Sequence, residues 1–114
     1  MELLSERHSD TLVIRVDEAR IDAAGAVDFK DSMRRATQDG AARVVLDLSQ
    51  VPLVDSSGLG AIVAVMKQLG AGCPLELAGL TPNVATVFRL TRMDTVMRIH
   101  GGVDDALSLA RPAC

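Results

Sequence analysis

The sequence predicts an α/β fold in which a mixed, mostly parallel β-sheet of four to five strands packs with about four helices. Two observations predict this class. Short apolar runs rich in β-branched residues alternate with segments of about ten or more residues that have helical periodicity. The connections between them are short, as in βαβ crossovers. The chain has 114 residues, 48% of them hydrophobic, which fits one domain over residues 1–114 with a tail at 111–114.

The first third of the chain predicts two strands and a helix. Residues 3–7 form a weak strand, whereas residues 11–16 alternate in the way expected of a strong one. Asp22 is a suitable N-cap for a helix over residues 23–38, and Gly40 ends that helix. Its apolar stripe consists of Ala26, Phe29, Met33 and Ala36.

The central segment predicts a buried strand, a turn and a second helix. Residues 44–48 are apolar except for Asp47, as in a strand covered on both faces. Ala61 and Ala64 lie off the apolar face of the second helix, which predicts a strip of small residues open to a partner, although alanine is also simply a good helix former. The apolar face itself consists of Leu59, Ile62, Val63, Met66 and Leu69.

The last third continues the alternation. Residues 74–78 predict a short strand, and Thr81 followed by Pro82 predicts the N-cap and first residue of a third helix. A last strand is expected over residues 95–100 and a terminal helix over residues 103–110.

Two serines and an aspartate lie where the second helix begins, in the sequence Asp-Ser-Ser-Gly-Leu-Gly over residues 55–60. The first amide groups of a helix have no internal acceptors, so Asp55 or Ser56 can cap them, and the helix dipole favours an added anion such as phosphate. Gly58 and Gly60 have no side chains, which would let another protein approach Ser57 closely. A simple helix cap explains any one of these residues, and their combination favours a functional turn.

Composition and charge exclude several classes of protein. The net charge of -3, with scattered basic residues and neither Trp nor Tyr, argues against binding nucleic acid. No apolar stretch approaches the roughly 20 residues that cross a bilayer, so no membrane insertion is expected. The start of the sequence has no apolar signal region, so a cytoplasmic protein is expected. Cys73 and Cys114 are therefore expected to be free thiols.

Enzyme classes receive little support. Ser57, Asp94 and His100 occur in the chain order of an α/β-hydrolase triad, but a nucleophile elbow needs glycine two residues before and two after the serine, and neither serine of the turn has both. His8 and His100 are isolated from other metal-ligating residues. The sequence therefore predicts a protein that is not an enzyme and has no catalytic residue, metal or cofactor.

The turn and its surroundings resemble the STAS domain, specifically the bacterial anti-sigma factor antagonists. The hallmark of that family is a strand ending in Asp-Leu-Ser, a short bridge, and Asp-Ser-Ser-Gly-Leu-Gly opening a helix; here the two motifs occupy residues 47–49 and 55–60. The resemblance extends to Arg-Ile-Asp at residues 20–22 and to Val-Phe-Arg-Leu-Thr at residues 87–91. It covers most of the chain.

The resemblance implies a function as well as a STAS-like fold. Ser57 would be phosphorylated by a partner kinase that is also the anti-sigma factor and that brings ATP and Mg²⁺, and a metal-dependent serine phosphatase would reverse the modification. The unphosphorylated protein would bind the kinase and so release a sigma factor. The expected contact surface consists of Asp22, Asp55, Ser56, Ser57, Gly58, Leu59, Gly60, Ala61 and Ala64. The alternative is a STAS-domain subunit of a membrane complex that transports lipids or anions, in which the turn would be a static contact.

Overall fold

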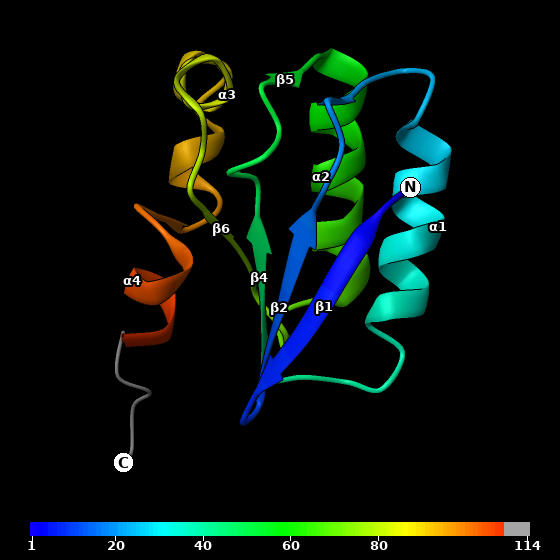
Figure 1. Cartoon of the computed structure of the whole chain (residues 1–114), viewed down its shortest axis with the longest axis vertical. Coiled ribbons are helices and arrows are strands. Elements are labelled where there is room, and N and C mark those ends of the chain that lie inside the picture. Colours follow the sequence, from blue (N-terminus) through cyan, green and yellow to red (C-terminus); the bar gives the residue numbers. More distant parts are fainter. Residues whose placement is uncertain (109–114) are drawn as a thin grey trace.

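A computed structural model describes residues 1–108 of the chain. Five strands form one sheet in the order β1-β2-β4-β6-β7, in which β1 is antiparallel to β2 and all the other neighbours are parallel (Figure 1). This confirms the predicted α/β class with a mixed, mostly parallel sheet. The strands are β1 (Leu3–His8), β2 (Thr11–Val16), β4 (Arg43–Asp47), β6 (Leu75–Ala78) and β7 (Ile99–His100).

Of the four α-helices in the described residues, three lie on one face of the sheet. Alternate residues of a strand point to opposite faces, and the side chains of β2 and β4 that share a core with α1, α2 and α3 alternate with those that share a second, smaller core with α4. In Figure 1, α1 and α2 lie side by side with their N-terminal ends at the same, upper end of the molecule. The helices are α1 (Ala26–Ala36), α2 (Ser56–Leu69), α3 (Pro82–Leu90) and α4 (Val103–Ser108).

Two very short strands escaped the sequence analysis. β3 (Arg20–Ile21) and β5 (Leu53–Val54) pair in parallel as a separate sheet of two strands. Ile21 and Val54 are buried, whereas their neighbours Arg20 and Leu53 are exposed. Two residues are too few to show a period in the sequence, so the pairing is visible only in three dimensions.

The first helix begins later than predicted. α1 starts at Ala26 with Gly25 as its N-cap residue, so the expected N-cap role of Asp22 is wrong. The chain leaves β3 in an extended conformation and must turn before it can become helical, and that turn is closed by the hydrogen bond from Gly25 N–H to the carbonyl of Asp22 at 3.1 Å. The Asp22 side chain also accepts from Gly25 N–H, at 3.3 Å.

The buried face of α2 is also different from the predicted one. Its fully buried residues are Gly58, Ala61, Ile62 and Val65. Ala61 is only 4% exposed, so its predicted place in an open strip of small residues is wrong, whereas Ala64 is half-buried. Small residues face inward because they let the helix approach the sheet and β3 closely, and the larger residues of the predicted stripe mostly pack at the edges of the core.

The C-terminal part is more irregular than predicted. A short 3-10 helix (Met93–Thr95) replaces the beginning of the expected last strand, leaving only the two residues of β7. α4 is described as far as Ser108, and the remainder of the expected helix, the tail and Cys114 lie outside the described residues.

Cys73 is free and half-buried, and burial raises the pKa of its thiol. Within residues 1–108, no helix has the length and apolar character needed to cross a membrane.

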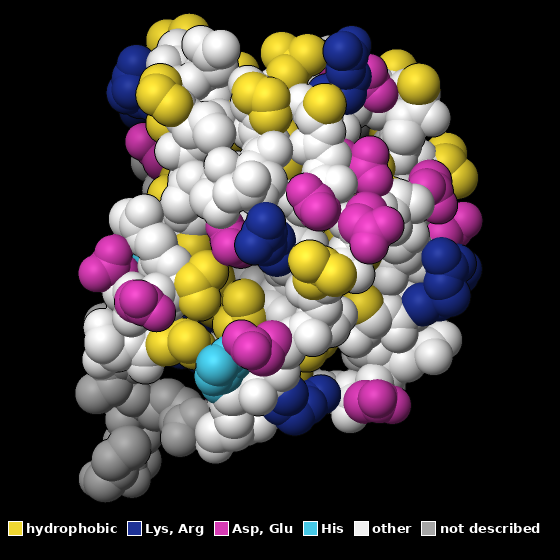
Figure 2. All heavy atoms as spheres, viewed as in Figure 1, with side chains coloured by type: hydrophobic (Ala, Val, Ile, Leu, Met, Phe, Trp, Pro, Cys, Tyr) yellow, Lys and Arg dark blue, Asp and Glu magenta, His cyan; other side chains and the backbone are white. Residues whose placement is uncertain are grey.

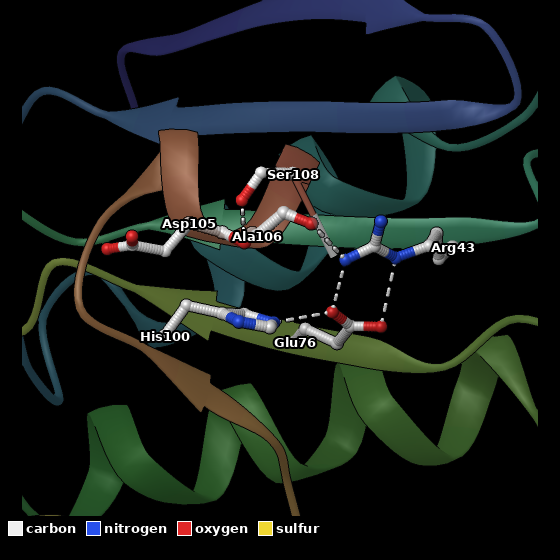
Figure 3. A network of polar contacts seen from close by, with 6 residues as sticks. All are labelled: Arg43, Glu76, His100, Asp105, Ala106 and Ser108. Atoms are coloured by element: carbon white, nitrogen blue, oxygen red, sulfur yellow. Dashed lines mark hydrogen bonds and ion pairs between the residues drawn. The ribbon is translucent and has the colours of Figure 1, made fainter. Parts of the chain in front are cut away.

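A buried ionic network holds α4 on the second face of the sheet (Figure 3). Arg43 donates two hydrogen bonds to the Glu76 carboxylate, at 3.1 and 2.6 Å, and a third to the carbonyl of Ala106 in α4 at 3.0 Å. His100 Nε2 lies 2.7 Å from Glu76 Oε1. Burial alone would raise the pKa of Glu76, but the hydrogen bonds and charges of Arg43 and His100 hold it below its ordinary value.

The lowered pKa of Glu76 predicts a specific loss of stability in acid. Because the folded pKa lies below the unfolded one, this carboxylate contributes stability above the unfolded pKa of about 4.3 and loses that contribution as pH falls through the folded pKa. We expect Glu76→Gln to lower the free energy of unfolding by about 1–3 kcal/mol at pH 7, because Arg43, whose side chain is 11% exposed, loses its counter-ion. We also expect the variant to have a shallower pH dependence below pH 5.

Urea titrations followed by circular dichroism measure both effects. Asp31→Asn is the control, because Asp31 pairs with Arg34 on the surface at 3.4 Å, where ion pairs contribute less than about 1 kcal/mol. The account of the network would be contradicted by equal acid sensitivity of the Glu76→Gln variant and the unmodified protein.

Candidate functional site

Asp55 fixes the turn at which α2 begins. Its backbone is extended, with φ of -91° and ψ of -175°, and its Oδ1 accepts from Gly58 N–H at 2.8 Å. Of the two candidate caps that the sequence offered, the structure therefore selects Asp55. Its carbonyl also accepts the first hydrogen bond of the helix, from Leu59 N–H at 2.8 Å.

Asp55 also ties this turn to the segment that follows β3. Its N–H donates to the carbonyl of Ile21 at 3.3 Å, and its Oδ2 accepts from Ala23 N–H at 3.4 Å. Asp22 lies between these two contacts, so the structure brings it beside the serine turn. Segments more than 30 residues apart in sequence thus meet at one end of the molecule.

Ser56 and Ser57 are the first two residues of α2, and both are exposed. The N–H groups of a first helical turn have no acceptor inside the helix. The Gly58 N–H donates to Asp55 Oδ1, whereas within residues 1–108 the N–H groups of Ser56 and Ser57 have no hydrogen-bond partner. The positive end of the helix dipole therefore lies beside the Ser57 hydroxyl, where it favours an anion.

Gly58 has a structural role that the sequence analysis did not assign. A Cβ on Gly58 would lie 1.9 Å from the carbonyl oxygen of Ile21 and 2.7 Å from its carbonyl carbon. The missing side chain therefore lets the first turn of α2 rest on the backbone of β3, and it faces inward rather than toward a partner. Gly60 differs, because it is exposed and a Cβ there would meet nothing within 4 Å.

The predicted contact residues fall into three groups by exposure. Ser56, Ser57 and Gly60 are exposed, whereas Gly58 and Ala61 are buried and act only through the position of the backbone. The half-buried members are Asp22, Asp55, Leu59 and Ala64.

Two further exposed residues, Arg20 and Leu53, flank the turn on β3 and β5. Sequence reasoning missed them as surface residues because the strands that carry them are so short. Figure 2 shows hydrophobic side chains gathered along the upper edge of the molecule, over β5 and the N-terminal ends of α1 and α2.

The residues of the rejected hydrolase triad do not form a site with the turn. Asp94 and His100 line a surface pocket of about 380 Å³ that does not include Ser57. His100 Nε2 is engaged with Glu76 instead. Within the described part of the chain, no group of three or more His, Cys, Asp or Glu side chains is placed to hold a metal ion.

Sequence comparison matches residues 2–106 to the STAS domain, and the chain belongs to this family. Solved structures agree with the assignment. An anti-sigma factor antagonist from Mycobacterium paratuberculosis, 26% identical, superposes with a TM-score of 0.84 over 94% of this chain and 91% of that one.

Two more distant structures share the fold. The Bacillus cell fate determinant SpoIIAA in its phosphorylated form is 21% identical, with a TM-score of 0.68 over 96% of this chain and 100% of that one. A sulfate transporter family protein from Wolinella succinogenes is 15% identical, with a TM-score of 0.76 over 89% of this chain and 84% of that one. The fold of this domain is thus shared with an anti-sigma factor antagonist and with a sulfate transporter family protein.

The contrast between Gly58 and Gly60 gives a direct test of the turn. We expect Gly58→Ala to lower the free energy of unfolding by more than about 3 kcal/mol, because the new Cβ would overlap the backbone of Ile21. Gly60→Ala, the matched control in the same helix, should raise it by about 0.5–1 kcal/mol, since alanine favours the helix and meets no neighbour. Urea unfolding followed by circular dichroism suits a chain without Trp or Tyr. A Gly58→Ala protein as stable as the parent would show that the close approach is not required.

Proposed function

We propose that this protein is an anti-sigma factor antagonist that is switched by phosphorylation of Ser57. In the unphosphorylated state it binds an anti-sigma factor serine kinase, and the kinase then releases its sigma factor. A metal-dependent serine phosphatase returns the modified protein to the binding state. The observation that carries the proposal is the placement of Ser57, an exposed hydroxyl in the first turn of a helix whose N–H groups at Ser56 and Ser57 have no acceptor among residues 1–108.

The chemistry of the switch belongs to the partner kinase. Ser57 Oγ would attack the γ-phosphorus of ATP, the bond from that phosphorus to the leaving ADP oxygen would break, and the hydroxyl proton would pass to a base of the kinase. The role of this chain is to present the hydroxyl on a rigid turn, with Asp55 holding the helix start and Gly58 seating it on β3.

The phosphate would be tolerated by the free protein. It adds a charge of about -1.5 to -2 at pH 7 beside a helix N-terminus, where the dipole and the free N–H groups favour it. Repulsion from Asp55 offsets part of that gain. The change should therefore be local, and the fold should survive it.

The same phosphate would be costly inside an interface. Burying a serine hydroxyl costs little if it finds an acceptor, whereas burying a dianion without a counter-ion costs several kcal/mol. The negative charge of the phosphate would therefore weaken the contact and release the partner that covers Ser57. In the alternative of a transport-complex subunit, by contrast, the turn would make a contact that does not depend on phosphate.

The first test is to locate the phosphate. We expect incubation with ATP, Mg²⁺ and each anti-sigma factor serine kinase of the source genome to yield one phosphate, mapped by mass spectrometry to Ser57. Ser56→Ala is the control and should still be modified, whereas Ser57→Ala should not. A phosphate found on Ser56, Ser49 or Thr81, with Ser57 unmodified, would contradict the proposal.

The binding arm of this test uses the same kinase in calorimetric titrations. Ser57→Ala should bind as the unmodified protein does, because the hydroxyl is small and the fold is unchanged. The phosphorylated protein should bind more than about tenfold more weakly, and Ser57→Asp should fall between them because it carries one charge rather than nearly two. Equal affinities for all forms would favour the transport-subunit alternative.

A further inference from the structure

The two-stranded sheet beside Ser57 presents a leucine and an arginine to solvent. Leu53 on β5 lies opposite Arg20 on β3 in the parallel register, so their side chains are neighbours on the same face of this small sheet. Leu53 is 44% exposed, and Arg20 is exposed. The second residue of each strand points the other way, since Ile21 of β3 and Val54 of β5 are buried in the core.

Neither exposed side chain is needed to hold the two strands together. The two strands are anchored in the core by the buried side chains of Ile21 and Val54. Arg20 forms no ion pair with any residue from 1 to 108. Leu53 is one of the few large hydrophobic side chains of the described residues that remain exposed. Arginine is enriched where proteins bind one another, and an exposed leucine gains stability when a partner removes it from water, so the pair suits a protein interface.

The position of the pair identifies what covers it. β5 is separated from Ser57 by only Asp55 and Ser56, and it packs against α2. A kinase that transfers a phosphoryl group to Ser57 Oγ must bring its own surface to within bonding distance of that atom. Leu53 is four residues before Ser57, and Arg20 precedes Ile21, whose carbonyl accepts from Asp55 N–H, so both residues border the surface that such a kinase must approach.

We propose that Leu53 and Arg20 are the docking determinant by which the partner kinase engages this protein, with Leu53 in an apolar pocket and Arg20 on a carboxylate at the rim of that pocket. This inference rests on the proposed function, and it names residues outside the serine motif. The carboxylate follows from charge complementarity: the guanidinium has no counter-ion of its own among the described residues, and a bidentate carboxylate is its best partner.

The chain supplies a matched control pair. Leu4 on β1 lies opposite Arg15 on β2, both side chains are exposed, and the exposed fraction of Leu4 is 47% against 44% for Leu53. The two pairs therefore have the same composition, and their leucines have nearly the same exposure, although Leu4 and Arg15 belong to antiparallel strands and Leu53 and Arg20 to parallel ones. They differ in place, because β1 and β2 belong to the large sheet and do not flank Ser57.

The experiment measures the dissociation constant and the phosphorylation kinetics with the purified kinase that modifies Ser57. Leu53→Ala and Arg20→Gln should each raise Kd about tenfold, whereas Leu4→Ala and Arg15→Gln should stay within about twofold. The two docking variants should also raise KM for phosphorylation and leave kcat unchanged, because the reacting hydroxyl is untouched. Circular dichroism confirms that each variant is folded.

The outcomes separate this inference from the function on which it rests. If the unmodified protein binds and is phosphorylated while Leu53→Ala and Arg20→Gln keep its Kd and KM, the docking determinant is overturned and the proposed function stands. If all four variants weaken binding alike, the loss is not specific to this surface and the inference also fails. If the unmodified protein neither binds nor is phosphorylated, the proposed function fails and the docking determinant fails with it.

Discussion

The close approach of α2 to β3 is the constraint on which the functional end of the molecule depends. Only a glycine fits at position 58, since any Cβ would lie 1.9 Å from the carbonyl oxygen of Ile21. Asp55 then links the start of α2 to the segment around β3 through hydrogen bonds with Gly58, Ile21 and Ala23. This contact seats the helix start, turns both serines to solvent and places Asp22 beside them.

Much of the fold was predictable because it depends on local patterns. Residues 11–16 are mostly apolar and rich in β-branched residues and form β2 with the predicted bounds, and Pro82 begins α3 as expected of a proline at the first helical position. The β3–β5 pair was not predictable, because two residues carry no period. The buried face of α2 was predicted one residue out of phase, because hydrophobicity favours Leu59 over Gly58, whereas close packing against a backbone selects the smallest side chain.

The same division applies to the candidate site. Residue type and position left Asp55 and Ser56 as the two candidate caps, and the structure selects Asp55. The inward role of Gly58 and the exposure of Arg20 and Leu53 depend on a contact between distant segments, which no local pattern reports. Charge is treated differently at the Glu76 network and at the serine turn. The buried charge of Glu76 is compensated by Arg43 and anchors α4, whereas the turn at Ser57 leaves its helix-terminal N–H groups open to an added charge.

The central claim is that the partner binds at the end of the molecule formed by the serine turn and the two-stranded sheet. Hydrogen–deuterium exchange of the protein, alone and in complex with the kinase, tests this most directly because it covers the whole backbone at once. The account predicts that the kinase slows exchange in residues 20–24 and 53–60 and leaves β1 and α4 unchanged. Slowed exchange confined to β1 and α4, with none in residues 53–60, would contradict it.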